Sequence, residues 1–336
     1  MKIAVVGVGA VGGLIAARLA AAGHEVSALA RGATLAALRD HGLRLRADGI
    51  ETRADIRASD DAADFGPQQL VIVAVKGPAL ARAAQQIQPL IGKSTVVMPA
   101  MNGVAWWFLR AGVPGSPAFE APLASVDPGG PIAALLPLRK VLGCVIHLSC
   151  SSPAPGVVQH GFGDRLIVGE PAGGTSDRVA QVCDALCSAG FSAEASPDIR
   201  RDIWFKLWGN MTMNPVSALT LAPCDRILDD PLVAAFMLDC MAEAAAIGER
   251  IGCPIRESGA DRMNVARKLG SFKTSMLQDL EAGRALEIDS LVSAVHEIGA
   301  RVGVATPNIA APSAWASSRR WTASNCWAPR PTPTKA

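Results

Sequence analysis

The chain has 336 residues, of which 50% are hydrophobic and 18% charged, so it is long enough for two domains with their own cores. A formal net charge of +2, few aromatic residues and no basic run give no sign of a nucleic-acid-binding surface. Gly, Pro or charged residues interrupt the longest apolar stretches, so we predict no membrane-spanning helix and no membrane partner.

The first predicted elements are a strand from Lys2 to Val6, a glycine-rich turn and a helix. A second strand, EVSALA, completes a βαβ unit of about thirty residues. The turn reads GVGAVG, in which Gly7 permits the tight turn, Gly9 lets a pyrophosphate approach the backbone, and Gly12 lets the helix pack on the strand. The helix would begin at Ala10 and Val11 and face the phosphates with its N-terminus. We therefore predict that this unit binds a dinucleotide.

Two cations follow predicted strands and indicate which dinucleotide binds. The second strand ends in Ala30, Arg31 and Gly32, without the acidic residue that would hold the ribose of NAD. Arg31 suits the 2′-phosphate of NADP, although an ordinary surface arginine is the alternative interpretation. A buried strand from Leu70 to Val75 ends at Lys76, which places a second cation at the carboxyl edge of the sheet.

The next strand, in STVVMPAMNGV, leaves Asn102 in the turn that follows it. We predict that Asn102 hydrogen-bonds the nicotinamide ribose or the substrate, although Asn-Gly is also a common turn dipeptide. From Trp106 to about Lys140 the chain is rich in proline and loses its periodicity, which predicts a long loop or lid.

Short strands and then helices are predicted for the rest of the chain. VLGCVIHLSC, GVVQHG, RLIVGE and FSAEAS have the pattern of strands, and we expect the first three to extend the same sheet. Beyond Pro197 the pattern becomes helical, over residues 198–214, 231–251, 258–269, 275–281 and 287–302, with Asp198 as an N-cap. We therefore predict an α/β dinucleotide-binding domain (1–197), an all-α substrate domain (198–310) with the active site between the two, and an irregular tail (311–336). Deleting the tail after Ala310 should leave activity intact.

Lys206, Asn210 and Asn214 stand four residues apart in WFKLWGNMTMNPVSALT. At about 100° per residue, one ammonium and two amides share a helix face among mostly apolar neighbours. Polar groups buried there need partners, and a ligand with a carbonyl, hydroxyl or carboxylate would supply them. The same spacing also occurs on ordinary solvated faces. Pro215 should kink or end the helix where the stripe ends.

The cysteines and histidines show no metal-binding pattern. The eight cysteines lack CxxC pairs and the five histidines do not cluster, so we predict reduced, mostly buried thiols and no metal. The apolar N-terminus has the glycine spacing of a folded strand and turn rather than of a signal peptide, and we expect a cytoplasmic protein.

Five motifs in this order, GVGAVGG, the cations Arg31 and Lys76, MNGV, KLWGNMTMNPVSALT and TSMLQDLEAGRALEID, resemble the ketopantoate reductase (2-dehydropantoate 2-reductase) family over roughly residues 1–308. The resemblance implies a Rossmann-type N-terminal domain, NADPH as coenzyme, a 2-oxo acid substrate, a role in pantothenate biosynthesis and a homodimer formed through the helical domain. It implies that Lys206 is the catalytic lysine and Glu287 its acidic partner. It assigns substrate binding to Asn210, Asn214 and Ser275, a place near the nicotinamide to Asn102, and the 2′-phosphate to Arg31 and Lys76.

The chain also departs from this family. The stretch from Asn102 to Cys144 is longer than in typical members and would place Trp106 and Trp107 beside the substrate, and the tail after Asn308 departs from the usual helical ending. Without the resemblance, Glu287 is an acid in the first turn of a helix and Ser275 is a helix cap.

In the expected reaction, hydride from NADPH reaches the ketone carbon, and Lys206 stabilises and protonates the carbonyl oxygen. Two alternatives remain. A β-hydroxyacid dehydrogenase would use a similar lysine and asparagine on a 3-hydroxy or 3-oxo acid, and a non-catalytic NADP-binding sensor would need neither Lys206 nor Glu287.

Overall fold

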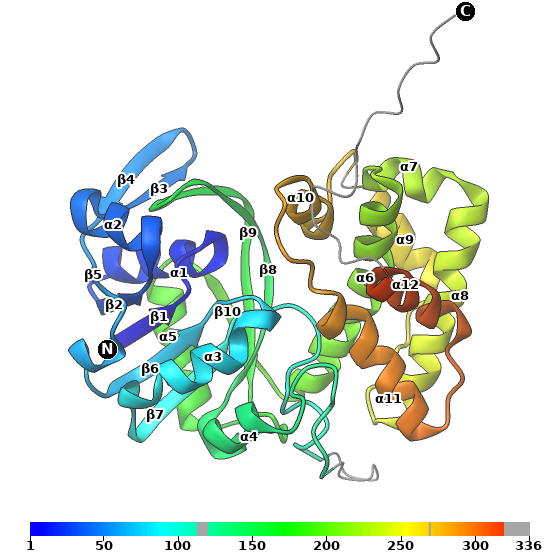
Figure 1. Cartoon of the computed structure of the whole chain (residues 1–336), viewed down its shortest axis with the longest axis horizontal. Helices are drawn as coiled ribbons and strands as arrows, with labels where there is room; N and C mark the ends of the chain where they lie inside the picture. Colours follow the sequence, from blue (N-terminus) through cyan, green and yellow to red (C-terminus); the bar gives the residue numbers. More distant parts are fainter. Residues whose placement is uncertain (113–119, 269, 319–336) are drawn as a thin grey trace, which may run out of the picture. The chain divides into compact units, whose positions relative to one another are not determined.

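The computed structural model describes residues 1–112, 120–268 and 270–318. The chain forms two compact units, labelled by their elements in Figure 1. Unit 1 comprises Met1–Lys206 and Ile251–Cys253, and unit 2 comprises Leu207–Arg250 and the chain from Pro254 onward. The units divide inside helix α6 (Ile199–Thr220) rather than at Pro197, so this helix begins in unit 1 and ends in unit 2.

A five-stranded parallel sheet forms the first layer of unit 1. The strand order is β5-β2-β1-β6-β7, the order of a Rossmann-type sheet, so the predicted fold class is confirmed. Its central strands are almost continuously apolar because helices and a second sheet exclude water from them. The bounds are β1 Lys2–Val6, β2 Glu25–Leu29, β5 Arg57–Ser59, β6 Gln68–Val73 and β7 Ile91–Pro99.

A second sheet, of order β10-β9-β3-β4 with β8 paired to β9, stands apart from the first. The prediction that its strands extend the first sheet was wrong. One strand, β9, contains most of both GVVQHG and RLIVGE. The middle of this strand is exposed and contains glycines, so the sequence pattern does not show that the strand is continuous. Shifts of register in its pairing with β8 accommodate this irregular middle. β8 and β9 appear as long curved strands in Figure 1. The bounds are β3 Leu43–Ala47, β4 Ile50–Ala54, β8 Gly143–Ala154, β9 Val157–Gly169 and β10 Ser192–Ser196.

Helix α1 joins the two sheets in one hydrophobic core. Leu14, Ile15 and Leu19 are fully buried, and this cluster also contains residues of β1, β8 and β9. A Cβ on Gly13 would lie 2.5 Å from the side chain of Val158 on β9, so this close packing requires glycine. The other helices of unit 1 are α2 Gly32–His41, α3 Leu80–Gln86, α4 Pro131–Leu135, α5 Asp177–Ser188 and the short 3₁₀ helices η1 Ala62–Asp64, η2 Gly77–Ala79, η3 Gln88–Leu90 and η4 Leu138–Lys140, with α1 at Ala10–Ala21.

The segment predicted as a loop or lid is anchored in the core at its start. The indoles of Trp106 and Trp107 are at most 2% exposed, so they present no face to a ligand. Phe108 stacks on Trp204 with ring centroids 5.9 Å apart, and its backbone oxygen accepts a 2.8 Å hydrogen bond from Arg200. These contacts hold the first two turns of α6 in unit 1. Residues 113–119 lie outside the described part of the chain.

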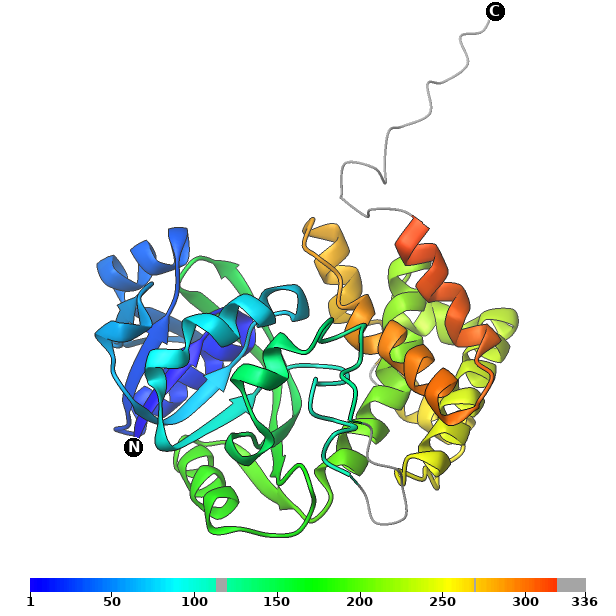
Figure 2. The ribbon, with the colours of Figure 1, turned by 60° about the horizontal axis from the view of Figure 1, so that its bottom comes forward.

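Unit 2 is helical, as predicted. Its elements are the end of α6, α7 Cys224–Asp229, α8 Pro231–Arg250, α9 Gly259–Arg267, α10 Ser275–Glu281, the π-helical segment η5 Asp289–Ser293, α11 Ala294–Val302 and α12 Pro307–Ser318. Residues of α6, α7, α8 and α9 share a core cluster. Figure 2 shows α11 and α12, in orange and red, side by side. Asp198 accepts a hydrogen bond from the backbone N–H of Arg201, which confirms it as the N-cap of α6.

Two helical predictions need correction. α6 does not end at Asn214 but continues through Pro215 to Thr220. Burial of Val216 and Ala218 offsets the hydrogen bond that Pro215 cannot donate. The tail is helical, not irregular, through Ser318, because Glu243 caps the backbone N–H groups of Asn308 and Ile309; residues 319–336 lie outside the described part.

Helix α8 is long and apolar. Among the described residues it alone has the length and apolar character of a membrane span, although no such helix was predicted. A single helix of this kind is weak evidence for a membrane, because a core helix of a globular domain has the same character. Its buried side chains include Met237, Met241 and Ile247.

Candidate active site

The glycine-rich turn has the shape of a phosphate-binding site. Gly7 has φ +88°, a conformation that favours glycine, and a Cβ on Gly12 would lie 2.1 Å from the backbone oxygen of Gly7. By contrast, a Cβ on Gly9 would meet nothing within 4 Å, so open space lies beside the first turn of α1. The helix has no side-chain cap, which leaves the N–H groups at Ala10 and Val11 for an anion. These residues therefore fit the pyrophosphate of a dinucleotide.

Arg31 and Lys76 lie on the same edge of the parallel sheet as this turn. Arg31 follows β2, is exposed and stands at the N-cap of α2, whose first turn contains no acidic residue. Lys76 follows β6 and directly precedes η2. In a parallel sheet the carboxyl ends of neighbouring strands meet, so both cations are placed where the coenzyme of such folds binds. Their roles toward a 2′-phosphate stay predictions.

The ammonium of Lys206 is held by two oxygen atoms of unit 1. Its Nζ donates a 2.8 Å hydrogen bond to Oδ1 of Asn102, in the turn after β7, and another to the backbone oxygen of Ile146 on β8. The prediction for Asn102 named the coenzyme and the substrate but missed its contact with Lys206. Sequence gave no signal for Ile146 either, because any residue can offer a backbone oxygen. The lysine is thus oriented at the carboxyl edge of the sheet.

A buried thiol lies close enough to Lys206 to experience its charge. Burial raises the pKa of Cys144 to about 12, and the positive charge of Lys206 opposes that rise only in part. The thiol therefore stays protonated at neutral pH and supplies no nucleophile. Among the described cysteines none forms a disulfide, and within the described ranges no three His, Cys, Asp or Glu side chains gather to hold a metal.

The remaining predicted residues belong to unit 2. Asn210 and Asn214 follow Lys206 at one-turn intervals along α6, and Asn214 is buried. Ser275 is not the cap of α10, because the hydroxyl of Thr274 accepts the capping hydrogen bond from Leu277. Glu287 precedes its helix rather than lying in the first turn, and η5 follows it. π-helical segments frequently occur at functional sites, a signal that the sequence does not show.

Two family descriptions match the chain. "Ketopantoate reductase PanE/ApbA" matches residues 3–106, and "Ketopantoate reductase PanE/ApbA C terminal" matches residues 198–313. The 2-dehydropantoate 2-reductase of Mesorhizobium japonicum is 44% identical over 310 residues, which cover 92% of this chain and 94% of the relative.

Solved structures of similar fold include members of the same family. A candidate ketopantoate reductase from Ralstonia solanacearum MolK2 superposes with a TM-score of 0.90 and 56% identity, covering 95% of this chain and 98% of its own. A D-mandelate dehydrogenase solved with NADH and anilino(oxo)acetate superposes with a TM-score of 0.79, covering 95% of this chain and 97% of its own. At 21% identity the latter likeness shows the shared fold alone.

Proposed function

Because the chain belongs to the ketopantoate reductase family, and is therefore an oxidoreductase that uses a nicotinamide dinucleotide, we propose that it reduces 2-dehydropantoate to pantoate with NADPH. The observation that carries this proposal is the placement of the Lys206 ammonium. Asn102 and Ile146 orient it at the sheet edge that also bears the glycine-rich turn. A fixed cation beside a coenzyme site suits the reduction of a carbonyl group.

The bound coenzyme supplies the hydride. As the ketone carbon is reduced, negative charge develops on its oxygen, and the Lys206 ammonium stabilises that charge by donating a hydrogen bond. Lys206 then gives the oxygen its proton as general acid. Asn102 limits the rotamers of the lysine, so less conformational freedom is lost when the substrate binds.

Roles for the residues of unit 2 rest on the family resemblance. We assign Asn210, Asn214 and Ser275 to the hydroxyl, carbonyl and carboxylate groups of the substrate, and Glu287 to an acidic partner role toward Lys206. Two observations support the assignment: the hydroxyl of Ser275 is not used as the helix cap, and Glu287 lies two residues before the π-helical segment η5. We also propose a cytoplasmic enzyme that acts as a homodimer.

Selectivity for NADPH should depend on Arg31. Replacing Arg31 by alanine should raise the KM for NADPH about 10- to 100-fold, because the 2′-phosphate loses a charge-assisted partner, and should change the KM for NADH less than about twofold. Steady-state rates with each coenzyme measure both effects. Arg39, exposed on the same helix, is the matched control, and Arg39→Ala should leave both constants near wild type. Equal effects of Arg31→Ala on the two coenzymes would contradict the role.

The direct test of the proposed function is NADPH oxidation with 2-dehydropantoate and a panel of 2-oxo and 3-oxo acids. Turnover of 3-oxo acids alone would favour a β-hydroxyacid dehydrogenase. NADPH binding without any turnover would favour a sensor.

A further inference from the structure

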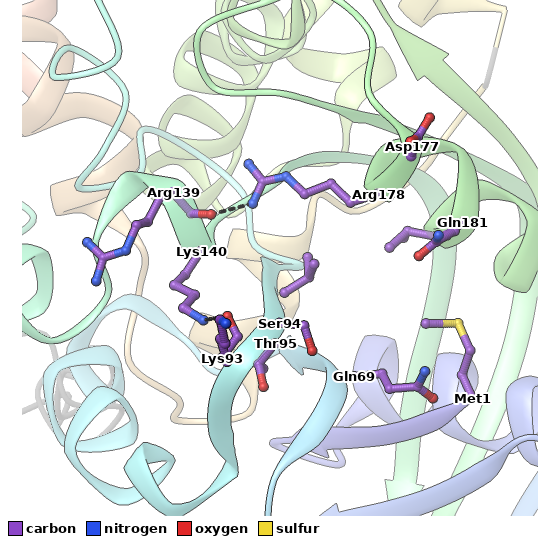
Figure 3. A pocket seen from close by; sticks show the side chains of 12 residues that line it. Met1, Gln69, Lys93, Ser94, Thr95, Arg139, Lys140, Asp177, Arg178 and Gln181 are labelled. Carbon is purple, nitrogen blue, oxygen red and sulfur yellow. Dashed lines mark hydrogen bonds between the residues drawn. The ribbon is translucent and has the colours of Figure 1, made fainter.

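A cavity lies in unit 1, away from the edge that carries the glycine-rich turn. Its volume is about 680 Å³, within the range of small-molecule sites. Figure 3 shows the side chains that line it, which include Gln69 near the start of β6 and Lys93 in the first half of β7. Both strands run in parallel toward the active-site edge, so this cavity opens at the amino edge of the same sheet. In such a fold the nicotinamide dinucleotide binds at the carboxyl edge of the sheet, so it does not account for this cavity.

The charges of this cavity are unbalanced. Four cationic side chains line it, Lys93, Arg139, Lys140 and Arg178, against one acidic side chain, Asp177. Within the described part of the chain, Arg178 alone of these four has a carboxylate partner, Glu170, at 2.5 Å. Among the residues that the structure describes, no carboxylate forms an ion pair with Lys93, Arg139 or Lys140. Figure 3 places Asp177 on the opposite side of the cavity from Arg139 and Lys140.

Two of these cationic side chains, Lys140 and Arg178, are held in place by hydrogen bonds to backbone oxygens. The ammonium of Lys140 donates to the backbone oxygens of Gly92, at 2.6 Å, and Lys93. The guanidinium of Arg178 donates to the backbone oxygens of Arg139 and, at 3.2 Å, Val141. Partial burial, followed by the charges of Arg139 and Arg178, lowers the pKa of Lys140, which is the direction that a locally positive potential produces. A bound anion would relieve this repulsion.

We propose that this cavity is a binding site for a small organic anion with two or more negative charges. Lys140 and the exposed side chains of Lys93 and Arg139 bind its charged groups. The guanidinium of Arg139 points away from the other side chains in Figure 3 and rotates toward the anion on binding. The amides of Gln69 and Gln181 on the other wall bind its polar remainder. Phosphate and carboxylate groups both pair with such cations. Pyrophosphate and citrate are therefore the probes that distinguish a phosphate ligand from a carboxylate ligand.

The test is calorimetric titration of the full chain with each probe. Saturating NADP⁺ keeps the glycine-rich turn occupied, so that neither probe binds there. The double variant Lys93→Glu/Arg139→Glu reverses two exposed charges of the cavity and spares the backbone oxygens that accept from Lys140. The matched control, Arg226→Glu/Lys268→Glu, reverses two exposed charges of unit 2 and changes the net charge equally.

We expect wild type to bind at least one probe, and the cavity variant to bind it at least about tenfold more weakly, because attraction becomes repulsion. The control variant should stay within about twofold of wild type, since its two exposed charges do not line the cavity and are screened by salt. Unchanged midpoints of thermal unfolding show that both variants fold. If the cavity variant does not fold, Lys93→Gln/Arg139→Gln replaces it, and we expect a smaller loss of probe affinity from this variant. Equal weakening in cavity and control variants, or no binding of either probe to wild type, would overturn the proposal. Because no step involves turnover, the result is independent of the proposed reaction.

Discussion

Replacing Lys206 by alanine should lower kcat by about 10³-fold while leaving the dissociation constant for NADPH within about threefold of wild type. The variant loses both the hydrogen bond that stabilises the developing negative charge and the proton that completes the reduction. Coenzyme binding depends on the glycine-rich turn and the strand-end cations, which the substitution leaves in place. Steady-state rates with 2-dehydropantoate and titration of NADPH fluorescence measure the two quantities separately.

Two further variants sharpen this experiment. Lys273 is an exposed lysine paired with Glu281 at 2.7 Å, and Lys273→Ala should leave kcat near wild type. Asn102→Ala removes an oxygen atom that accepts a hydrogen bond from Lys206, and should lower kcat by about 10- to 100-fold while the lysine keeps its charge. An unchanged kcat for Lys206→Ala would refute the catalytic assignment.

Gly12→Ala should destabilise unit 1 by about 3 kcal/mol and weaken NADPH binding at least about 100-fold. The new Cβ would lie 2.1 Å from the backbone oxygen of Gly7 and 2.9 Å from the Cβ of Ala74, so α1 must move away from β1 and the turn must change shape. Urea unfolding and NADPH titration measure the two effects.

Gly9→Ala is the matched control for this substitution. Its Cβ would meet no protein atom within 4 Å, so stability should change by less than about 1 kcal/mol, while coenzyme binding weakens because the methyl group occupies the space beside the helix N-terminus. If Gly12→Ala kept both the stability and the NADPH affinity of wild type, the packing explanation for Gly12 would be wrong.

The first sheet was predictable because its signals are local. The glycine spacing fixes strand, turn and helix in order, and β6 is apolar enough to be identified alone. The second sheet was not, because β3 and β4 are rich in charged residues and the apolar pattern of β9 is interrupted from Gly161 to Arg165. The pairing of β3 with β9 joins segments that are far apart in the sequence, so the composition of either strand does not reveal it.

The candidate site shows the same limit. Lys206 and Asn102 each stood out from the sequence, yet their hydrogen bond joins residues 104 positions apart and needed the fold to appear. The prediction that the helix ends before Pro215 was wrong for a related reason. Tertiary packing of the last turns of α6 outweighs the local preference of proline. The cavity at the amino edge gathers cations from β7, η4 and α5, and no sequence motif links these elements.

The most direct test of the central claim compares initial rates of NADPH oxidation with 2-dehydropantoate, other 2-oxo acids and 3-oxo acids at matched concentrations. We predict that kcat/KM for 2-dehydropantoate exceeds that for every 3-oxo acid by about 10²-fold or more, because a site built to bind a carboxylate next to the ketone leaves polar groups unpaired when the spacing changes. A larger kcat/KM for a 3-oxo acid, or NADPH binding without turnover of any acid, would contradict the account.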